Sequence, residues 1–192
     1  QLAKSRGLST HLDGARLFNA AVKQADQAGG DPYVQARKIA GLFDSVSVCL
    51  SKGLGAPAGS VLCGSKALIA RAHRWRKTAG GTMRQAGFLA AAGMYALEHH
   101  VHRLADDHAL AQRFAQGIMG IDGLKVEAPQ TNIVFVDLEG AARARAADFL
   151  PHLKARGVLA TGLHKLRFAT HLDVDAAGVD QAVAAVREFF HA

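Results

Sequence analysis

Hydrophobic and polar positions along the chain follow two repeats. Apolar residues three and four positions apart predict helices, whereas short alternating or continuous apolar runs predict strands. Helices are predicted over residues 15–28, 32–41, 65–78, 85–100, 103–119, 141–156 and 175–190. Strands are predicted over residues 9–12, 45–50, 60–63, 124–127, 132–138, 158–160 and 165–169. This mixture of packed helices and strands predicts an α/β fold.

Local signals set several boundaries. Asp31 can cap a helix whose first residue is Pro32, where a missing backbone donor costs nothing. The strands at 45–50 and 60–63 are expected to be buried, and the Ala-rich segment 85–100 is expected to be a buried connecting helix. We therefore expect two domains, over residues 1–100 and 101–192.

The chain has 192 residues, of which 49% are hydrophobic and 20% charged, as in folded globular domains. No apolar run is long enough to span a bilayer, and the first residues do not resemble a signal peptide, so a cytoplasmic location is expected. Cys49 and Cys63 lie in apolar stretches without metal-ligand spacing. They are expected to be buried, reduced thiols, and no metal site is predicted.

The formal net charge of +7 favours contact with anions and leaves a noncatalytic, polyanion-binding domain as one hypothesis. The densest basic positions are Arg71, Arg74, Arg76, Lys77 and Arg84. Aromatic residues are not interleaved with them as a base-stacking platform would require, so the pattern does not favour nucleic-acid binding.

A glycine-rich turn follows the strand at 45–50 and begins at Lys52. It contains Pro57 and leads into another strand, not into a helix, which argues against a dinucleotide-binding or P-loop motif. A lysine flanked by glycine after a buried strand is expected to be partly desolvated, which favours the neutral amine needed to form an imine. An ordinary solvated lysine on a turn is the alternative.

Upstream, Asp13 stands between a predicted strand and a predicted helix, with Arg16 three residues later. A carboxylate there can keep the ring nitrogen of pyridoxal phosphate (PLP) protonated, so Asp13 and Lys52 together suit a PLP site. Taken alone, an Asp before a helix is more often simply an N-cap.

Four segments resemble the L-threonine aldolases, PLP enzymes with the fold of aspartate aminotransferase (fold type I). The segments are HLDGARLFNA at 11–20, SVCLSKGLGAP at 47–57, MRQAG at 83–87 and RFATHLDV at 167–174. The resemblance implies that Lys52 binds the cofactor covalently, that Asp13 pairs with the pyridine nitrogen and that Arg16 lies near the phenolic oxygen. It also implies that Arg167 binds the substrate carboxylate, a role that suits the guanidinium fork.

The same resemblance places Lys77 and Arg84 at a site shared between subunits, near the cofactor phosphate or the substrate. A solvated helix end is the alternative for Lys77. His11 and His171 lie inside matched motifs and are expected to be structural, whereas His73, His99, His100 and His102 are expected on helix surfaces. These four helix histidines carry no predicted role.

The resemblance implies the second half of the large-domain sheet, followed by a small C-terminal α/β domain. The N-terminal half of the enzyme is expected as a partner, from a separate chain or a cleaved piece, in a homodimer or homotetramer. The expected reaction is cleavage of L-threonine, L-allo-threonine or a related β-hydroxy-α-amino acid to glycine and an aldehyde. A β-eliminating PLP lyase of the same fold is the alternative within enzymes.

Overall fold

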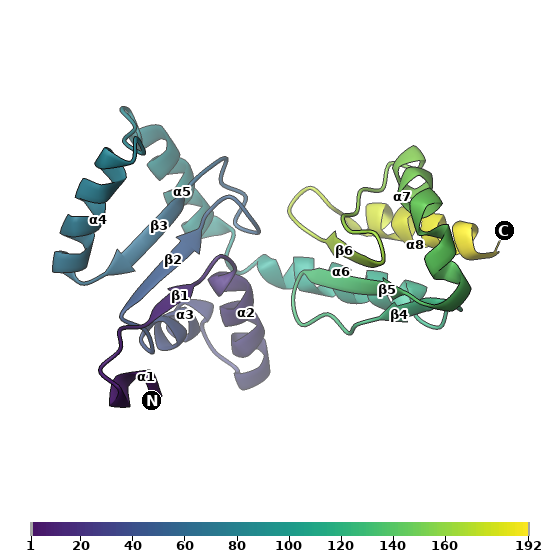
Figure 1. Ribbon diagram of the computed structural model, residues 1–192, viewed down its shortest axis with the longest axis horizontal. Coiled ribbons are helices and arrows are strands. Elements are labelled where there is room, and N and C mark those ends of the chain that lie inside the picture. The colour runs from purple at the N-terminus through teal and green to yellow at the C-terminus, as the bar shows by residue number, and fades with distance from the viewer. Residues whose placement is uncertain (1, 192) are drawn as a thin grey trace. The chain divides into compact units, whose positions relative to one another are not determined.

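The computed structural model describes residues 2–191 in two compact units, one ending at Leu104 and the other beginning at Ala105 (Figure 1). The division falls after Leu104 because Val101 and Leu104 are both fully buried in a core cluster of the first unit. None of the helices in residues 2–191 is long and apolar enough to cross a membrane. The functional roles expected for residues 1–100 and 101–192 stay predictions.

The first unit contains a three-stranded sheet in the order β1-β2-β3 (Figure 1). Its strands are β1 (His11–Asp13), β2 (Ser45–Cys49) and β3 (Ser60–Gly64). The first two strands pair in parallel and the last two are antiparallel. The unit's helices are α1 (Leu2–Ser5), α2 (Leu17–Ala28), α3 (Pro32–Ala40), α4 (Lys66–Thr78) and α5 (Gly87–His99). The α2 and α3 helices form the crossover that parallel strands require.

Apolar side chains of α2 and α3 pack on β2. Leu17 and Ala21 of α2 lie in one buried cluster with Val46 and Val48, two alternate residues of the strand. Successive side chains of β2 point to opposite faces of the sheet, so the alternate buried residues all face these helices. A second cluster joins α2 to the segment after β2 and to the end of α5; it contains Val22, Leu50, Leu54, Ala56, Ala96, Val101 and Leu104.

Capping explains two helix starts and a backbone angle explains a third. The Asp31 carboxylate accepts a hydrogen bond from the Tyr33 N–H at 2.8 Å, with Pro32 at the first helical position, as predicted. The Ser65 hydroxyl accepts from the Leu68 N–H at 3.2 Å and starts α4. The last predicted helix of this unit begins at Gly87 instead of residue 85, because Gln85 has a left-handed φ of 53° that cannot continue a right-handed helix.

Three burial predictions for the first unit are wrong. Every residue of β3 is exposed, and so is the Cys63 thiol, whereas Cys49 is half-buried. Most of α5 is exposed as well, with Phe88 at 82%. Apolar character predicted burial, but burial requires a covering element, and among residues 2–191 the cover of β3 and α5 is incomplete.

The second unit contains an antiparallel sheet in the order β4-β5-β6. Its strands are β4 (Leu124–Val126), β5 (Ile133–Leu138) and β6 (Lys165–Ala169), and its helical segments are α6 (Leu104–Ile118), the 3-10 helix η1 (Gly140–Arg145), α7 (Ala146–Ala155) and α8 (Ala176–His191). Alternate residues of β5 and β6 share one large cluster with all three α-helices, so one face of the sheet carries the core.

Two element predictions in the second unit differ from the structure. Residues 158–160 do not form a strand; only Thr161 makes a single bridge with Arg167, because Gly157 and Gly162, with φ of 74° and 107°, bend the chain on either side. The helix predicted over 141–156 is divided into η1 and α7. The tighter first part is stabilised by bonds such as that from the Ala142 N–H to the Glu139 carbonyl.

Truncation of Phe149 tests the core of the second unit. Phe149 is 1% exposed, and its ring centroid lies 4.8 Å from that of Phe189 and 5.2 Å from that of Phe190. Phe149→Ala is expected to lower the free energy of unfolding by about 3–5 kcal/mol, measured by urea denaturation. Leu159→Ala, at a position 78% exposed, is the control and is expected to change it by less than about 0.5 kcal/mol. Equal losses for both variants would contradict the assigned core.

A carboxylate that ties the start of β2 to the segment before β1 predicts a pH effect. The Thr10 N–H and hydroxyl donate to Asp44 Oδ2 at 2.7 and 2.9 Å, and these bonds lower the pKa of Asp44. A lowered folded-state pKa stabilises the fold above the unfolded value of about 4, and this stabilisation is lost as pH falls through the folded pKa. Asp44→Asn should therefore flatten the acid side of the melting-temperature profile, and Asp26→Asn should not. An unchanged profile in Asp44→Asn would contradict this.

Candidate active site

Parallel pairing of β1 with β2 places two of the predicted site residues at one edge of the first sheet. Asp13, the last residue of β1, is in register with Ser47, and the Gly14 N–H donates to the Ser47 carbonyl at 2.8 Å. Because parallel strands leave a sheet on the same side, Asp13 and the loop that follows β2 lie at the same edge. Lys52 is in that loop.

Gly14 allows the chain after Asp13 to lie against β2. A Cβ atom added at Gly14 would be 2.8 Å from the Ser47 carbonyl oxygen and 3.0 Å from Val46 Cγ1, too close for any side chain. The turn then orients the carboxylate, because the Ala15 N–H donates to Asp13 Oδ1 at 3.1 Å. Among the described residues this is the one hydrogen-bond partner of the Asp13 side chain, which is exposed.

Asp13 is not the N-cap of α2. That position belongs to Arg16, whose side chain makes no capping bond and is half-buried beside the same turn. The sequence-based alternative for Asp13, a simple helix cap, is therefore wrong. Its carboxylate accepts the Ala15 N–H and is exposed, so it can still bind a ligand at this edge of the sheet, near the N-cap residue Arg16.

The lysine-bearing loop is closed at its base by backbone hydrogen bonds. The Leu50 N–H donates to the Gly59 carbonyl at 3.0 Å, and the Ala56 N–H donates to the Leu50 carbonyl at 3.0 Å. Lys52 itself is exposed, contrary to the expected partial desolvation. Within residues 2–191 its amine makes no hydrogen bond or ion pair, so the nitrogen is available to a ligand.

The remaining basic candidates of the first unit lie on or near α4. Lys77 is in the last turn of that helix, and Arg84 is in the segment between α4 and α5; both side chains are exposed. The structure does not join either of them to Asp13 or Lys52 by a described hydrogen bond or ion pair. Their roles toward a neighbouring subunit stay predictions.

Arg167 belongs to the second unit. It is exposed on β6, and its backbone pairs with Thr161 through hydrogen bonds of 2.8 and 3.2 Å. Its neighbour Phe168 is buried on the opposite face of the strand. The guanidinium is therefore solvent-facing, as a carboxylate ligand requires, and its substrate role stays a prediction.

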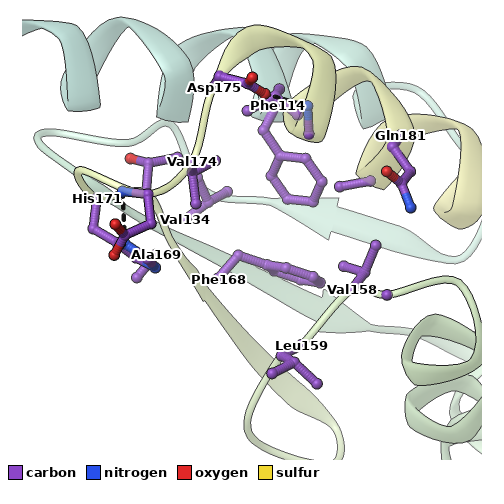
Figure 2. A pocket seen from close by; sticks show the side chains of 16 residues that line it. Phe114, Val134, Val158, Leu159, Phe168, Ala169, His171, Val174, Asp175 and Gln181 are labelled. Carbon is purple, nitrogen blue, oxygen red and sulfur yellow. Dashed lines mark hydrogen bonds and ion pairs between the residues drawn. The ribbon is translucent and has the colours of Figure 1, made fainter.

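A cavity of about 320 Å³ lies inside the second unit, on the face of β6 opposite Arg167 (Figure 2). Figure 2 shows the Phe168 ring among Val158, Val174 and Phe114. Several polar groups of its lining bond to the protein itself: the Thr170 hydroxyl donates to the Asp107 carbonyl and the Gln181 amide to the Arg156 carbonyl, both at 2.6 Å, and Asp175 Oδ1 accepts from the Gly178 N–H at 2.8 Å. His171 and Asp173 form an exposed ion pair with each other. This cavity offers no set of groups comparable to Asp13 and Lys52.

One residue near the lysine loop was not identified from the sequence. His100, expected on a helix surface, is half-buried, and its Nδ1 lies 2.6 Å from the Leu54 carbonyl oxygen. The sequence shows only a run of histidines at the end of a helix, and nothing in that run indicates a contact 46 residues upstream. Tertiary packing alone reveals it.

Residues 1–141 match the family described as beta-eliminating lyase. The chain is 40% identical over its whole length to probable low-specificity L-threonine aldolase 2 of Arabidopsis thaliana, of which it covers 53%. It is also 40% identical to the low specificity L-threonine aldolase of Escherichia coli K12, over 98% of this chain and 53% of that protein.

A solved threonine aldolase from Leishmania major superposes with a TM-score of 0.71 at 19% identity, over 98% of this chain and 54% of that one. The likeness shows that the fold is that of the PLP-dependent enzymes of fold type I, as predicted. The chain spans about half the length of the relatives that it matches. On the match over residues 1–141, the chain belongs to the beta-eliminating lyase family.

Proposed function

We propose that this chain carries the lysine-bearing part of a PLP-dependent aldolase that cleaves β-hydroxy-α-amino acids to glycine and an aldehyde. L-threonine and L-allo-threonine are the proposed substrates. The observation that supports the proposal most strongly is the position of Asp13 and the Lys52 loop at one edge of a sheet with parallel β1 and β2. Relatives named L-threonine aldolases support the reaction class.

The groups at this edge fit PLP. A primary amine without a described partner can bind an aldehyde, and an exposed carboxylate suits a protonated pyridine nitrogen. A Cβ at Gly14 would lie 2.8 Å from the Ser47 carbonyl oxygen, and one at Gly53 would lie 2.8 Å from Leu104 Cδ2, so the backbone beside both groups is closely packed. Bound PLP supplies an electron sink for the electron pair left at Cα when the Cα–Cβ bond breaks.

The chain's own residues would hold and orient the reactants. Lys52 Nζ would bind the cofactor aldehyde and release it to the substrate amine. The Asp13 carboxylate would keep a proton on the ring nitrogen by accepting a hydrogen bond from it. Arg16, at the start of α2, would lie toward the phenolic oxygen.

Arg167 would bind the substrate carboxylate through its guanidinium fork. Lys77 and Arg84 would reach the phosphate or substrate of a neighbouring subunit in a homodimer or homotetramer. All three side chains are exposed, which suits a role toward ligands or partner subunits.

The N-terminal half of the enzyme is the proposed partner of the first unit. β1 and β3 are the edge strands of its three-stranded sheet, and exposed strand edges favour pairing with a further strand. An apolar groove of about 270 Å³ also crosses α2, α3, β2 and β3. Both features support a large domain completed by another segment.

The family's description keeps β-elimination as the second candidate. The two reactions differ in the bond that breaks and therefore in their products. Aldol cleavage releases glycine and an aldehyde, whereas β-elimination releases ammonia and an oxo acid. Product analysis of the full enzyme with L-threonine distinguishes them.

Replacement of Lys52 tests the covalent role of its amine. In the full enzyme, borohydride reduction is expected to leave a pyridoxyl group on Lys52, found by peptide mapping. Lys52→Ala is expected to lose this adduct and to lower kcat by about 1,000-fold or more, as removal of a covalent catalyst does. Lys38→Ala, at another exposed lysine of the same unit, is the control and should match the wild type. Threonine cleavage at the normal rate by Lys52→Ala would refute the mechanism.

Asp13→Asn tests the carboxylate without changing its size. An amide oxygen can still accept the Ala15 N–H, so the turn should be retained, whereas the negative charge beside the ring nitrogen is lost. We expect kcat to fall by about 100-fold, the order found when one preorganised electrostatic partner is removed. The melting temperature should stay near that of the wild type. A wild-type kcat would exclude Asp13 from pairing with the ring.

A further inference from the structure

The loop that bears Lys52 is attached to the turn at the end of α5. His100 is the C-cap residue of that helix, and its Nδ1 lies 2.6 Å from the carbonyl oxygen of Leu54, two residues after the lysine. A carbonyl oxygen can only accept, so Nδ1 carries the hydrogen and donates it. The bond joins segments 46 residues apart and is half-buried.

The same loop also packs closely against Leu104 and Asn19, at the position of Gly53. A Cβ atom added at Gly53 would lie 2.8 Å from Leu104 Cδ2 and 3.3 Å from Asn19 Oδ1. Leu104 is fully buried and Asn19 is 4% exposed, so both side chains are enclosed by the core of the first unit. The backbone next to Lys52 is therefore closely packed, and a larger residue at position 53 requires a shift of the loop or of these side chains.

This contact also links the two halves of the candidate site. Asn19 belongs to α2, which begins directly after the turn formed by Asp13 and Gly14. Leu54, 3% exposed, is in the same apolar cluster as Val22 of α2. The α2 helix, which follows Asp13, and the loop that bears Lys52 are thus packed directly against each other.

We propose that the packing at Gly53 and the hydrogen bond from His100 together position Lys52, which makes His100 a positioning residue. This role rests on the proposed PLP function, which does not itself include His100. By donating to the Leu54 carbonyl, the imidazole restrains the loop that carries Lys52 at the same edge of the sheet as Asp13. Loss of the donor leaves a nearly buried carbonyl unsatisfied and frees the loop, whereas the fold of the core clusters persists.

Two substitutions at His100 distinguish the effect of its hydrogen-bond donor from the effect of its side-chain size. His100→Phe keeps a ring and removes the donor, and His100→Asn keeps a donor at a similar distance from the backbone. His99→Phe is the matched control, since the described interactions of the exposed His99 ring are with Tyr95, at a centroid distance of 4.2 Å, and with Glu98. Each variant is made in the full enzyme.

The first readout needs no cofactor. Amide hydrogen exchange reports the loop bonds from the Gly55 N–H to the Lys52 carbonyl, 2.8 Å, and from the Ala56 N–H to the Leu50 carbonyl. In His100→Phe both amides are expected to exchange about 10-fold faster or more, the effect of one lost hydrogen bond. His100→Asn and His99→Phe should exchange like the wild type.

The second readout is the PLP concentration at which half of Lys52 carries a borohydride-trapped pyridoxyl group. It is expected to rise by about 10- to 100-fold in His100→Phe, with a fall in kcat, and to return toward the wild-type value in His100→Asn. Wild-type trapping and exchange in His100→Phe would overturn the inference and leave the proposed function standing. Absence of any adduct on Lys52 in the wild-type enzyme would overturn the proposed function itself.

Gly53→Ala provides an independent test that leaves His100 intact, and it decides the matter if His100→Phe does not fold. The added methyl group would lie 2.8 Å from Leu104 Cδ2 and 3.3 Å from Asn19 Oδ1, and because both side chains are buried in the core we expect the loop to shift away from them. Reduced trapping at Lys52 in the folded variant supports the proposed positioning of Lys52. Trapping equal to that of the wild type overturns this proposal.

Discussion

Asp13 and the Lys52 loop reach one edge of the sheet because β1 and β2 run parallel, and Gly14 lets the chain after β1 lie directly against Ser47. The N–H of this glycine donates to the Ser47 carbonyl at 2.8 Å, which closes the pairing at the position where the carboxylate leaves the strand. Were the strands antiparallel, their carboxyl ends would lie at opposite edges. A carboxylate and an amine could not then serve one ligand from these two positions.

Support of the lysine comes from residues that carry no chemistry of their own. The loop is long and rich in glycine, so its conformation depends on contacts outside it: the His100 bond, the buried Leu54 and the surface beneath Gly53. Reactive groups need such support, since a misplacement of about 1 Å can greatly reduce catalysis. The exposed Lys52 side chain is free at its tip, and its backbone is restrained.

The two units differ in how completely they bury their apolar residues. The second unit collects the alternate residues of β5 and β6 and three helices into one cluster. The first unit has two smaller clusters, an exposed β3 and an apolar groove across its sheet. The sheet that bears Asp13 and Lys52 is thus the part suited to receive a companion segment, whereas the unit that bears Arg167 has a core of its own.

The sequence by itself determined the α/β class, most helices and strands, the Asp31 cap and the candidate positions Asp13 and Lys52, because periodicity, capping and short motifs are local. It failed where the outcome depends on contacts made elsewhere in the chain. Apolar residues of β3 and α5 were expected to be buried, but burial depends on a covering element and not on composition. The bond of His100 to the lysine loop has no local signal either, since only the tertiary fold brings together residues 46 positions apart.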